Sequence, residues 1–207
     1  MIHELSHPLA ISLVNRLRST SCDASCFRRT VAELARILSY EAFIHTPLRF
    51  GEIRTWSGEE RYGFIDGKEY VMVPILRAGM PMLESVLELL PDAAAGFLAM
   101  RRDETTHKAV LYYDRVPECR GKHVVLLDPM VATGGSLCDA IAAIKEKGAE
   151  RIVSLNIIGS PEGVDRVNRE HPDVEVYIAK IDERLDADKF IHPGLGDAGD
   201  RAYNTPE

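Results

Sequence analysis

The residues best suited to chemistry lie near the middle of the chain, where a carboxylate precedes a loop of small residues. Asp128 ends the apolar run HVVLLD, and residues 132–136 read ATGGS before an amphipathic segment begins. Small residues let a ligand approach the backbone, and the first N–H groups of a helix lack intrahelical partners. Thr133 and Ser136 add hydroxyl donors. The pattern therefore predicts a phosphate-binding loop; the alternative is an ordinary strand-to-helix turn with Asp128 as a cap.

Three glycines in the segment PGLGDAGD fit the pattern G-x-G-x-x-G, which usually indicates a dinucleotide site. Only eight residues follow Gly199, so we expect neither the helix nor the downstream acidic residue that such a site needs. Glycine also lets backbone N–H and C=O groups approach a flat ring closely. The segment is therefore expected to serve another kind of ligand.

Two positions with arginine offer cationic partners for phosphate groups. Arg77 follows the apolar run YVMVPIL, and the small residues Ala78 and Gly79 come directly after it. Arg101 and Arg102 stand together in RRDET. A guanidinium binds phosphate oxygens through two N–H groups at once. Charge alone does not separate Arg101 from Arg102, and a solvated strand end is the alternative for Arg77.

The composition is that of a globular protein and disfavours several classes of function. The 207 residues carry a net charge of −7, with 45% hydrophobic residues, so we expect one domain over residues 1–207. Nucleic-acid-binding proteins usually have a basic surplus, and no apolar run approaches the roughly 18 residues of a membrane span. The start MIHELSHPLA is unlike a secretory signal. We therefore expect a cytoplasmic protein without nucleic-acid or membrane partners.

The cysteines are expected to be free thiols in a reducing compartment. Cys22 and Cys26 are too isolated to indicate zinc, because Cys119 and Cys138 offer no second pair at ligand spacing. No protein-bound structural metal is expected.

Apolar periodicity predicts an N-terminal helical region followed by alternating strands and helices. Residues 8–44 read as two helices, and Asp23 or Ser21 is expected to cap the second. From residue 70 onward, apolar runs that suit buried strands alternate with helical segments, which predicts an α/β fold with a parallel sheet flanked by helices on both faces. Ligands in such sheets bind beyond the carboxyl ends of the strands. Strands are expected at YVMVPILRAG, AAAGFLAM, AVLYYDRVP, HVVLLD, RIVSLNIIG and VEVYIAKI, and helices at MPMLESVLELL, GGSLCDAIAAIKEKG and PEGVDRVNREH.

The segment VVLLDPMVATGGS resembles the phosphoribosyl pyrophosphate motif of the type I phosphoribosyltransferases. Most of that superfamily has two adjacent acids at the strand end, whereas here Pro129 follows Asp128. That departure matches the uracil phosphoribosyltransferase branch, which VPILRAG, RRDET and PGLGDAGD also resemble, in the expected order. The similarity runs from about residue 2 to residue 205. It implies that uracil and 5-phosphoribosyl 1-pyrophosphate are converted to uridine monophosphate and pyrophosphate in pyrimidine salvage.

The resemblance also implies which residues bind each substrate. Asp128 and Arg102 are expected to be catalytic, with Arg102 rather than Arg101 at the pyrophosphate. The residues expected at 5-phosphoribosyl 1-pyrophosphate are Arg77, Arg102, Asp128, Pro129, Met130, Val131, Ala132, Thr133, Gly134, Gly135, Ser136 and Asp197, and those expected at uracil are Ile191, Gly196, Asp197 and Ala198. Mg²⁺ is implied, held mainly by the substrate's oxygens. A cis peptide bond is implied between Arg77 and Ala78.

The family architecture adds N-terminal helices, a β-hairpin arm and a C-terminal hood over the base. Residues 107–117 correspond to the arm, with Tyr112 and Tyr113 expected on a partner subunit, over the site or in the core. His192 is expected to be structural. A homo-oligomer, dimer or higher, is implied, with GTP as a candidate effector. The alternatives are an RNA-binding regulator, an inactive ligand-binding homologue, and an enzyme for a different base.

Overall fold

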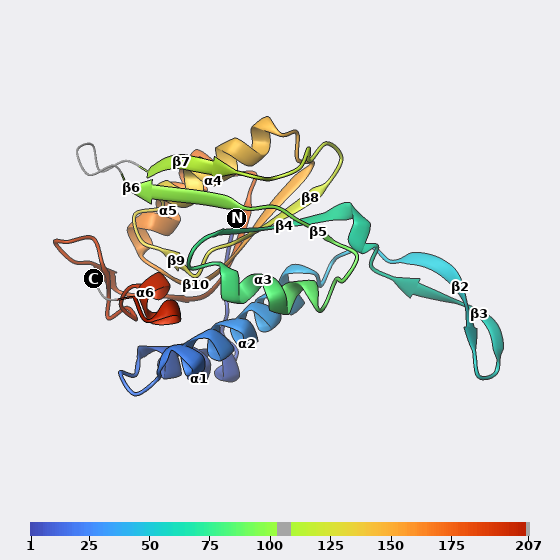
Figure 1. The fold of residues 1–207 in the computed structure, drawn as a ribbon, viewed down its shortest axis with the longest axis horizontal. Coiled ribbons are helices and arrows are strands. Elements are labelled where there is room, and N and C mark those ends of the chain that lie inside the picture. The colour runs from blue at the N-terminus through green and yellow to red at the C-terminus, as the bar shows by residue number, and fades with distance from the viewer. Residues whose placement is uncertain (103–108, 206–207) are drawn as a thin grey trace.

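The computed structural model describes residues 1–102 and 109–205, and its centre is a sheet with helices on both faces (Figure 1). Within the described residues the sheet has nine strands. The neighbouring strands pair in parallel except β6 and β7, which are antiparallel and lie at one edge. The predicted α/β class with a parallel sheet flanked by helices is confirmed.

The strand order changes direction between β4 and β8, which are neighbours in the sheet. In open parallel sheets a ligand binds at such a switch point, beyond the carboxyl ends of the strands. Arg77 directly follows β4 and Asp128 directly follows β8, so both lie at this point. The order is β1 (Ile2–Glu4), β11 (Glu175–Ile181), β10 (Arg151–Gly159), β8 (His123–Leu127), β4 (Tyr70–Leu76), β6 (Leu98–Arg102) and β7 (Ala109–Asp114), with β5 (Ala94–Ala95) on β4 and β9 (Met130–Val131) on β10.

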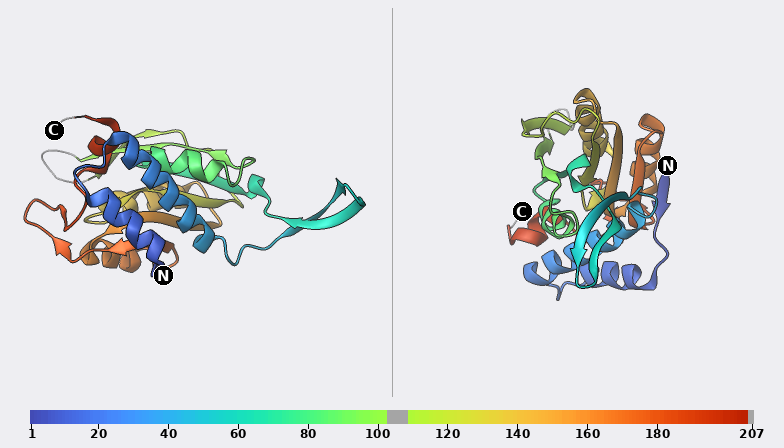
Figure 2. Two further views of the ribbon diagram at one scale, coloured as in Figure 1. Left: turned by 90° about the horizontal axis from the view of Figure 1, so that it is seen from below. Right: turned by 90° about the vertical axis from the view of Figure 1, so that its right-hand side faces the viewer.

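Two hydrophobic cores lie against the two faces of the sheet. Helices α1 (Pro8–Arg18), α2 (Ala24–Ala42) and α3 (Met80–Leu87) cover one face (Figures 1 and 2). Helices α4 (Gly135–Glu146) and α5 (Pro161–Glu170) cover the other. Alternate residues of each strand point to opposite faces, so one strand contributes to both cores: Met72 packs in the first, and Val71 and Val73 in the second.

Helix α2 begins at a cap that the sequence predicted, but its cysteines are not free. The Asp23 side chain accepts a hydrogen bond from the Cys26 N–H at 2.7 Å, whereas Ser21 pairs with Ser19 instead. Cys22 and Cys26 form a disulfide, with their Cα atoms 5.3 Å apart. The prediction of free thiols was wrong here, because the start of α2 brings Cys26 close to Cys22, which lies just before the Asp23 cap. Cys119 and Cys138 are free, as expected.

The β-hairpin arm is built from a different segment than the one predicted. Strands β2 (Arg49–Thr55) and β3 (Gly58–Phe64) pair only with each other and extend away from the body (Figures 1 and 2). A short 3₁₀ helix, η1 (Gly67–Glu69), leads from β3 back to the sheet. Within the predicted arm, residues 107–117, the described part instead contains the edge strand β7 (Ala109–Asp114), which pairs with β6. Tyr112 and Tyr113 are 62% and 45% exposed, so the alternative of core packing for them was wrong.

The C-terminal segment folds back over the carboxyl end of the sheet. It contains the two-stranded ribbon of β12 (Arg184–Leu185) and β13 (Ile191–His192) and the short helix α6 (Ala198–Tyr203). We call residues 182–205 the hood. His192 pairs with Arg184 in the ribbon, which agrees with a structural role. Over the described residues, no helix has the length and apolar character needed to cross a membrane.

Candidate active site

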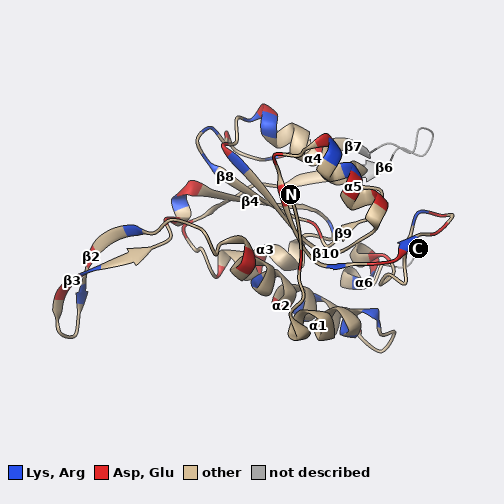
Figure 3. Ribbon diagram, turned by 180° about the vertical axis from the view of Figure 1, so that it is seen from behind, with Lys and Arg blue, Asp and Glu red and all other residues tan. Residues whose placement is uncertain are grey.

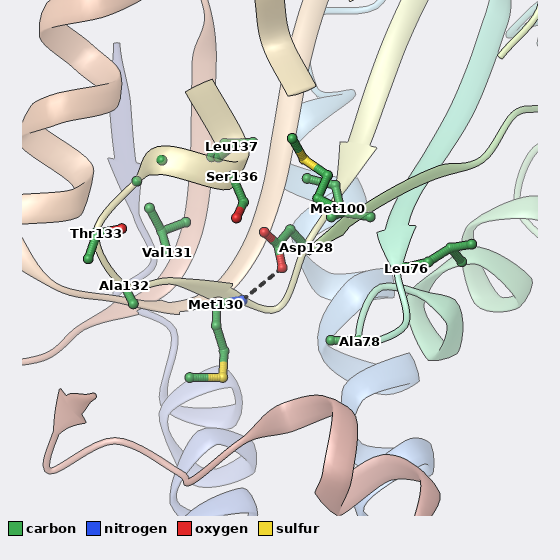
Figure 4. Close-up of a pocket in the computed structure, with 13 residues that line it drawn as sticks. Leu76, Ala78, Met100, Asp128, Met130, Val131, Ala132, Thr133, Ser136 and Leu137 are labelled. Atoms are coloured by element: carbon green, nitrogen blue, oxygen red, sulfur yellow. Dashed lines mark hydrogen bonds between the residues drawn. The ribbon is translucent and has the colours of Figure 1, made fainter. Parts of the chain in front are cut away.

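The predicted phosphate loop lines an open cavity of about 200 Å³ at the carboxyl end of the sheet (Figure 4). Asp128 follows β8, and residues 132–136 comprise the connection after β9 and the first two residues of α4. Figure 4 shows the Asp128 carboxylate and Ser136 on facing sides of this space. The cavity is lined by Ile75, Leu76, Ala78, Met100, Asp128, Met130, Val131, Ala132, Thr133, Gly134, Gly135, Ser136 and Leu137.

Gly134 gives the phosphate loop its shape. It caps α4 with a left-handed conformation, φ +75°, which only glycine adopts without strain. A Cβ atom at this position would lie 2.6 Å from the carbonyl oxygen of Gly163, at the start of α5. Ser160 reinforces this contact, because its hydroxyl donates to the carbonyl of Ala132 at 2.6 Å. The loop is therefore fixed from behind by α5, and its other side is free to face an anion.

Asp128 is the buried carboxylate of the site, with 8% of its surface exposed. Burial raises its pKa to about 7, and a hydrogen bond from the Met130 N–H opposes that rise weakly at 3.4 Å. The side-chain amide of Asn156 donates to the Asp128 carbonyl at 2.6 Å, which holds the backbone at the end of β8. A carboxylate so poorly compensated favours a ligand that brings hydroxyl donors or positive charge to it.

The loop after β4 passes close to the end of β8. A Cβ atom at Gly79 would lie 2.2 Å from the carbonyl oxygen of Leu127, so this position admits only glycine. The contact places the β4 loop beside Asp128. The loop contains a cis peptide bond, as the sequence predicted, but between Leu76 and Arg77 rather than between Arg77 and Ala78. The predicted position was wrong by one residue; the cis bond lies directly at the end of β4.

The Arg77 side chain does not line the cavity but contacts the hood. Its guanidinium donates to the Asp200 carboxylate at 2.9 Å and to the Thr205 hydroxyl at 3.2 Å. The side chain is 56% exposed, although both of these bonds hold its guanidinium against the hood. Arg77 thus joins the β4 loop to residues far away in the sequence.

The hood is held in place by two arginines that bind backbone carbonyls. Arg201 donates to the carbonyls of Leu17, Ser19, Cys22 and Leu195, and its guanidinium lies 4.7 Å from the centre of the Phe27 ring. Arg18 donates to the Gly194 carbonyl at 2.7 Å and forms an ion pair with Asp182. Asp182 in turn accepts from the Gly194 N–H at 3.0 Å. These contacts attach the hood to the end of α1 and the start of α2.

The glycines of the hood have the backbone conformations that a close turn requires. Gly194 and Gly196 have φ of +64° and +77°. Ile191 and Ala198, the predicted uracil contacts beside them, are 5% and 2% exposed. Their side chains therefore pack inward, so at these two positions a ligand would meet backbone groups.

The predicted site residues fall into two groups in the structure. Asp128 and residues 130–136 line one cavity, while Pro129 contributes a carbonyl that accepts hydrogen bonds from Ile157 and Ile158. Ile191, Gly196, Asp197 and Ala198 lie in the hood, connected to the first group through Arg77. Arg102 ends β6, and Asp103, Glu104 and Thr105 of the same motif lie outside the described residues.

Sequence reasoning missed the residues that organise the hood. Asp200 and Thr205 bind Arg77 across 123 and 128 positions of the chain, and no local pattern signals such a pair. Arg18 and Arg201 likewise act through backbone carbonyls far away in the sequence. The available signal was chemical: Asp200 and Arg201 are charged residues beside a glycine-rich turn.

Comparison with known structures identifies the fold as that of the phosphoribosyltransferases. A purine phosphoribosyltransferase from Pyrococcus horikoshii Ot3 is 18% identical, with a TM-score of 0.50 over 73% of this chain and 83% of that one. This likeness concerns the fold alone. A solved structure of a protein from Aquifex aeolicus is much more similar, with a TM-score of 0.95 and 44% identity over 98% of each chain.

The chain belongs to the uracil phosphoribosyltransferase family, whose model matches residues 4–205. A uracil phosphoribosyltransferase from Aquifex aeolicus (strain VF5) is 44% identical over 203 residues, covering 98% of each chain. One from Fervidobacterium nodosum is 40% identical over 206 residues, covering 99% of this chain and 100% of the relative. The resemblance predicted from the four motifs is confirmed.

The close contact behind Gly134 leads to a stability prediction with a matched control. Gly121 also has a positive φ, +67°, but a Cβ atom there would meet nothing within 4 Å. Gly121→Ala is therefore expected to lower the free energy of unfolding by about 1 kcal/mol, from backbone strain alone. Gly134→Ala adds a clash with the Gly163 carbonyl and should cost about 2–4 kcal/mol. Urea unfolding measures both; equal losses would show that α5 does not brace the loop.

The raised pKa of Asp128 predicts an unusual dependence of stability on pH. The pKa is about 7 in the folded protein and near 3.8 when unfolded, so the folded state holds the proton more tightly. This contribution is complete below about pH 4 and is lost as the pH rises to about 7. It corresponds to a free energy on the order of 4 kcal/mol. Asp128→Asn should therefore be more stable than the original protein at pH 8, and the two should converge toward pH 4.

Proposed function

We propose that this chain transfers the phosphoribosyl group of 5-phosphoribosyl 1-pyrophosphate to uracil. The bond between ribose C1 and the pyrophosphate oxygen breaks, a bond from C1 to uracil N1 forms, and N1 loses its proton. The observation that carries the proposal is the meeting of three segments at the switch point of the sheet: the phosphate loop, the β4 loop with Arg77, and the hood. They supply separate surfaces for phosphate, pyrophosphate and base.

In the proposed complex, the phosphate loop binds the 5′-phosphate through the backbone N–H groups of residues 132–136. The Thr133 and Ser136 hydroxyls add donors, and the loop precedes the N-terminus of α4, a favourable place for an anion. Asp128 accepts hydrogen bonds from the ribose hydroxyls, and their donation favours its charged form over the protonated one. Once charged, Asp128 stabilises the positive charge that develops at C1 as pyrophosphate departs.

Arg77 and Arg102 are proposed to neutralise the departing pyrophosphate. The two arginines follow β4 and end β6, which are neighbouring parallel strands, so their backbones lie at the same edge of the sheet. Planar guanidinium groups match the oxygens of a pyrophosphate better than point charges do. Asp197 is proposed to contact the phosphoribosyl group from the opposite side, at the start of α6.

Mg²⁺ is proposed as the cofactor, bound mainly through the substrate. Asp128 is the one carboxylate among the residues that line the described cavity, which suits an ion that keeps water ligands and one or two protein oxygens. When bound, the ion would neutralise charge on the pyrophosphate. The cluster of Cys138, Glu170 and His171 offers sulfur and nitrogen donors and does not suit Mg²⁺.

The hood is proposed to recognise uracil with backbone groups. Uracil presents two carbonyl acceptors with an N3–H donor between them, and adjacent backbone N–H and C=O groups can pair with that edge. Gly196, Asp197 and Ala198 offer such groups at a turn without bulky side chains. Backbone groups cannot exchange donor for acceptor, unlike a side-chain amide that flips. Cytosine, which has an amino donor in place of O4 and no N3 proton, is therefore mismatched.

The arm supports the proposal of a homo-oligomer. It pairs with no other described strand, and an isolated two-stranded hairpin is marginally stable in water. Trp56 at its tip is 99% exposed, and Phe50 and Phe64 are 61% and 46% exposed. A second copy that covers these side chains would stabilise the arm.

We also propose a role in pyrimidine salvage and GTP as an effector, on the family resemblance alone.

A cytoplasmic location is proposed on the free Cys119 and Cys138, while the Cys22–Cys26 disulfide argues for more oxidising conditions.

The RNA-binding alternative has little support from the charge distribution. Figure 3 shows Lys and Arg interspersed with Asp and Glu along the described elements rather than gathered on one face. Electrostatic binding of nucleic acid needs such a gathered patch.

The proposal predicts strong selectivity for uracil among free bases. Two mismatched polar groups at about 1–3 kcal/mol each should reduce kcat/KM for cytosine by about 30-fold to 10⁴-fold. Turnover of uracil, cytosine, hypoxanthine and adenine is measured with 5-phosphoribosyl 1-pyrophosphate, with and without Mg²⁺ and GTP. Comparable rates for cytosine and uracil would refute base reading by the hood.

Gly196→Val separates base binding from phosphate binding in the same assay. Gly196 has φ +77°, so valine is strained there, and we expect its side chain to obstruct the surface assigned to the base. Uracil turnover should fall while 5-phosphoribosyl 1-pyrophosphate still binds in a calorimetric titration. Gly121→Val, at φ +67° in open space far along the chain, controls for backbone strain and should retain uracil turnover.

The arm predicts a change of assembly when its exposed aromatic side chains are replaced by polar ones. Trp56→Ser and Phe50→Ser together remove apolar surface that we assign to the contact between copies, so the average mass in sedimentation equilibrium should fall toward that of one chain. Tyr112→Ser, exposed at the other end of the sheet, is the control. An unchanged mass in the double variant would exclude the arm as the contact.

A further inference from the structure

Asp200 contacts Arg77 of the β4 loop and Asp197 of the hood. The proposed function assigns both residues to phosphoribosyl pyrophosphate. Its backbone N–H donates to the Asp197 carboxylate at 2.8 Å, and its own carboxylate accepts from Arg77 at 2.9 Å. The Thr205 hydroxyl donates to the same carboxylate at 2.5 Å. Asp197, Asp200 and Arg77 thus form a continuous chain of hydrogen bonds between two separate segments.

The geometry restricts the Arg77 guanidinium without occupying all of its N–H donors. Two N–H groups donate, to Asp200 and Thr205, and a guanidinium carries more donors than these two bonds require. The side chain remains 56% exposed, whereas that of Asp200 is 24% exposed. A long side chain that is held at one edge and open at the other is well placed to bind an anion, because its conformational freedom is already reduced.

The charge of Asp200 is maintained by its partners. The hydrogen bond from Thr205 and then the ion pair with Arg77 lower the pKa of the Asp200 carboxyl below its usual value. At neutral pH the group is therefore a carboxylate, and the pair with Arg77 is a charge-assisted hydrogen bond. The corresponding amide would keep the shape but lose the charge.

We propose that Asp200 is a positioning residue for the phosphoribosyl transfer, acting through Arg77 and, by its backbone, through Asp197. It aligns the pyrophosphate-binding guanidinium with the hood, so that the leaving group and the base are held in a fixed position relative to each other. The inference rests on the proposed function for its kinetic meaning, but the alignment of Arg77 toward pyrophosphate is testable without turnover.

The first test compares Asp200→Asn with Asp188→Asn, an exposed hood residue, as the control for loss of one negative charge. Asp200→Asn should raise KM for 5-phosphoribosyl 1-pyrophosphate about tenfold, with kcat and the uracil KM changed less than threefold. Asp188→Asn should leave all three constants unchanged. Thr205→Val, which removes one bond to each of Asp200 and Arg77, should raise the same KM by a smaller factor. An unchanged or lower KM in Asp200→Asn would overturn the proposal. An unchanged KM would mean that Asp200 does not assist binding, and a lower KM would mean that it competes with the ligand for Arg77.

The second test uses inorganic pyrophosphate as a probe in calorimetry and needs no catalysis. Asp200→Asn should weaken pyrophosphate binding about tenfold in the original background and have no further effect in an Arg77→Met background. An equal loss in both backgrounds would show a general structural role and overturn the proposal. If the unmodified protein bound pyrophosphate but did not convert uracil, the proposed function would fail. The comparison of Asp200→Asn in the two backgrounds would still test whether Asp200 acts through Arg77.

Discussion

The site depends on the close approach of backbone segments that carry no side chain between them. Gly79 brings the loop after β4 against the Leu127 carbonyl at the end of β8, and Gly134 brings the phosphate loop against Gly163 of α5. Both contacts exclude a Cβ atom. They set the spacing between Arg77, Asp128 and the phosphate loop before any ligand binds. A preorganised set of charges of this kind needs little rearrangement during reaction.

The hood is fixed by a different kind of contact. Arg201 and Arg18 donate hydrogen bonds to backbone carbonyl oxygens at several points of the chain. Arg18 also forms an ion pair with the Asp182 carboxylate. Each guanidinium satisfies backbone acceptors that would otherwise be left at helix ends and turns. Burial lowers the pKa of Arg201, which is the expected effect of removing a cation from water. Arg18 and Arg201 thus attach the hood to the N-terminal helices, while the Asp182 N–H attaches its start to the sheet by donating to the Gly159 carbonyl of β10 at 2.8 Å.

The segments that sequence reasoning predicted well are those whose pattern is local. The strand ending at Asp128, the glycine loop and helix α4 follow one another directly, so composition and spacing are sufficient. The arm was assigned to the wrong segment because β2 and β3 have largely exposed residues on both faces and no apolar alternation. The Cys22–Cys26 disulfide was missed because cysteine spacing was judged for zinc alone. The bonds from Arg77 to Asp200 and Thr205 join residues more than a hundred positions apart, and only the folded chain brings them together.

The position of the hood in the sequence has a consequence for the order in which the site is made during translation. The phosphate loop, Asp128 and helices α4 and α5 are all synthesised before residues 182–205. The segment proposed to bind the phosphate is therefore synthesised before the segment proposed to bind the base. The carbonyls of Leu17, Ser19 and Cys22 are synthesised well before Arg201, which donates hydrogen bonds to all three. The proposed base selectivity therefore depends on contacts that cannot form until both segments have been synthesised.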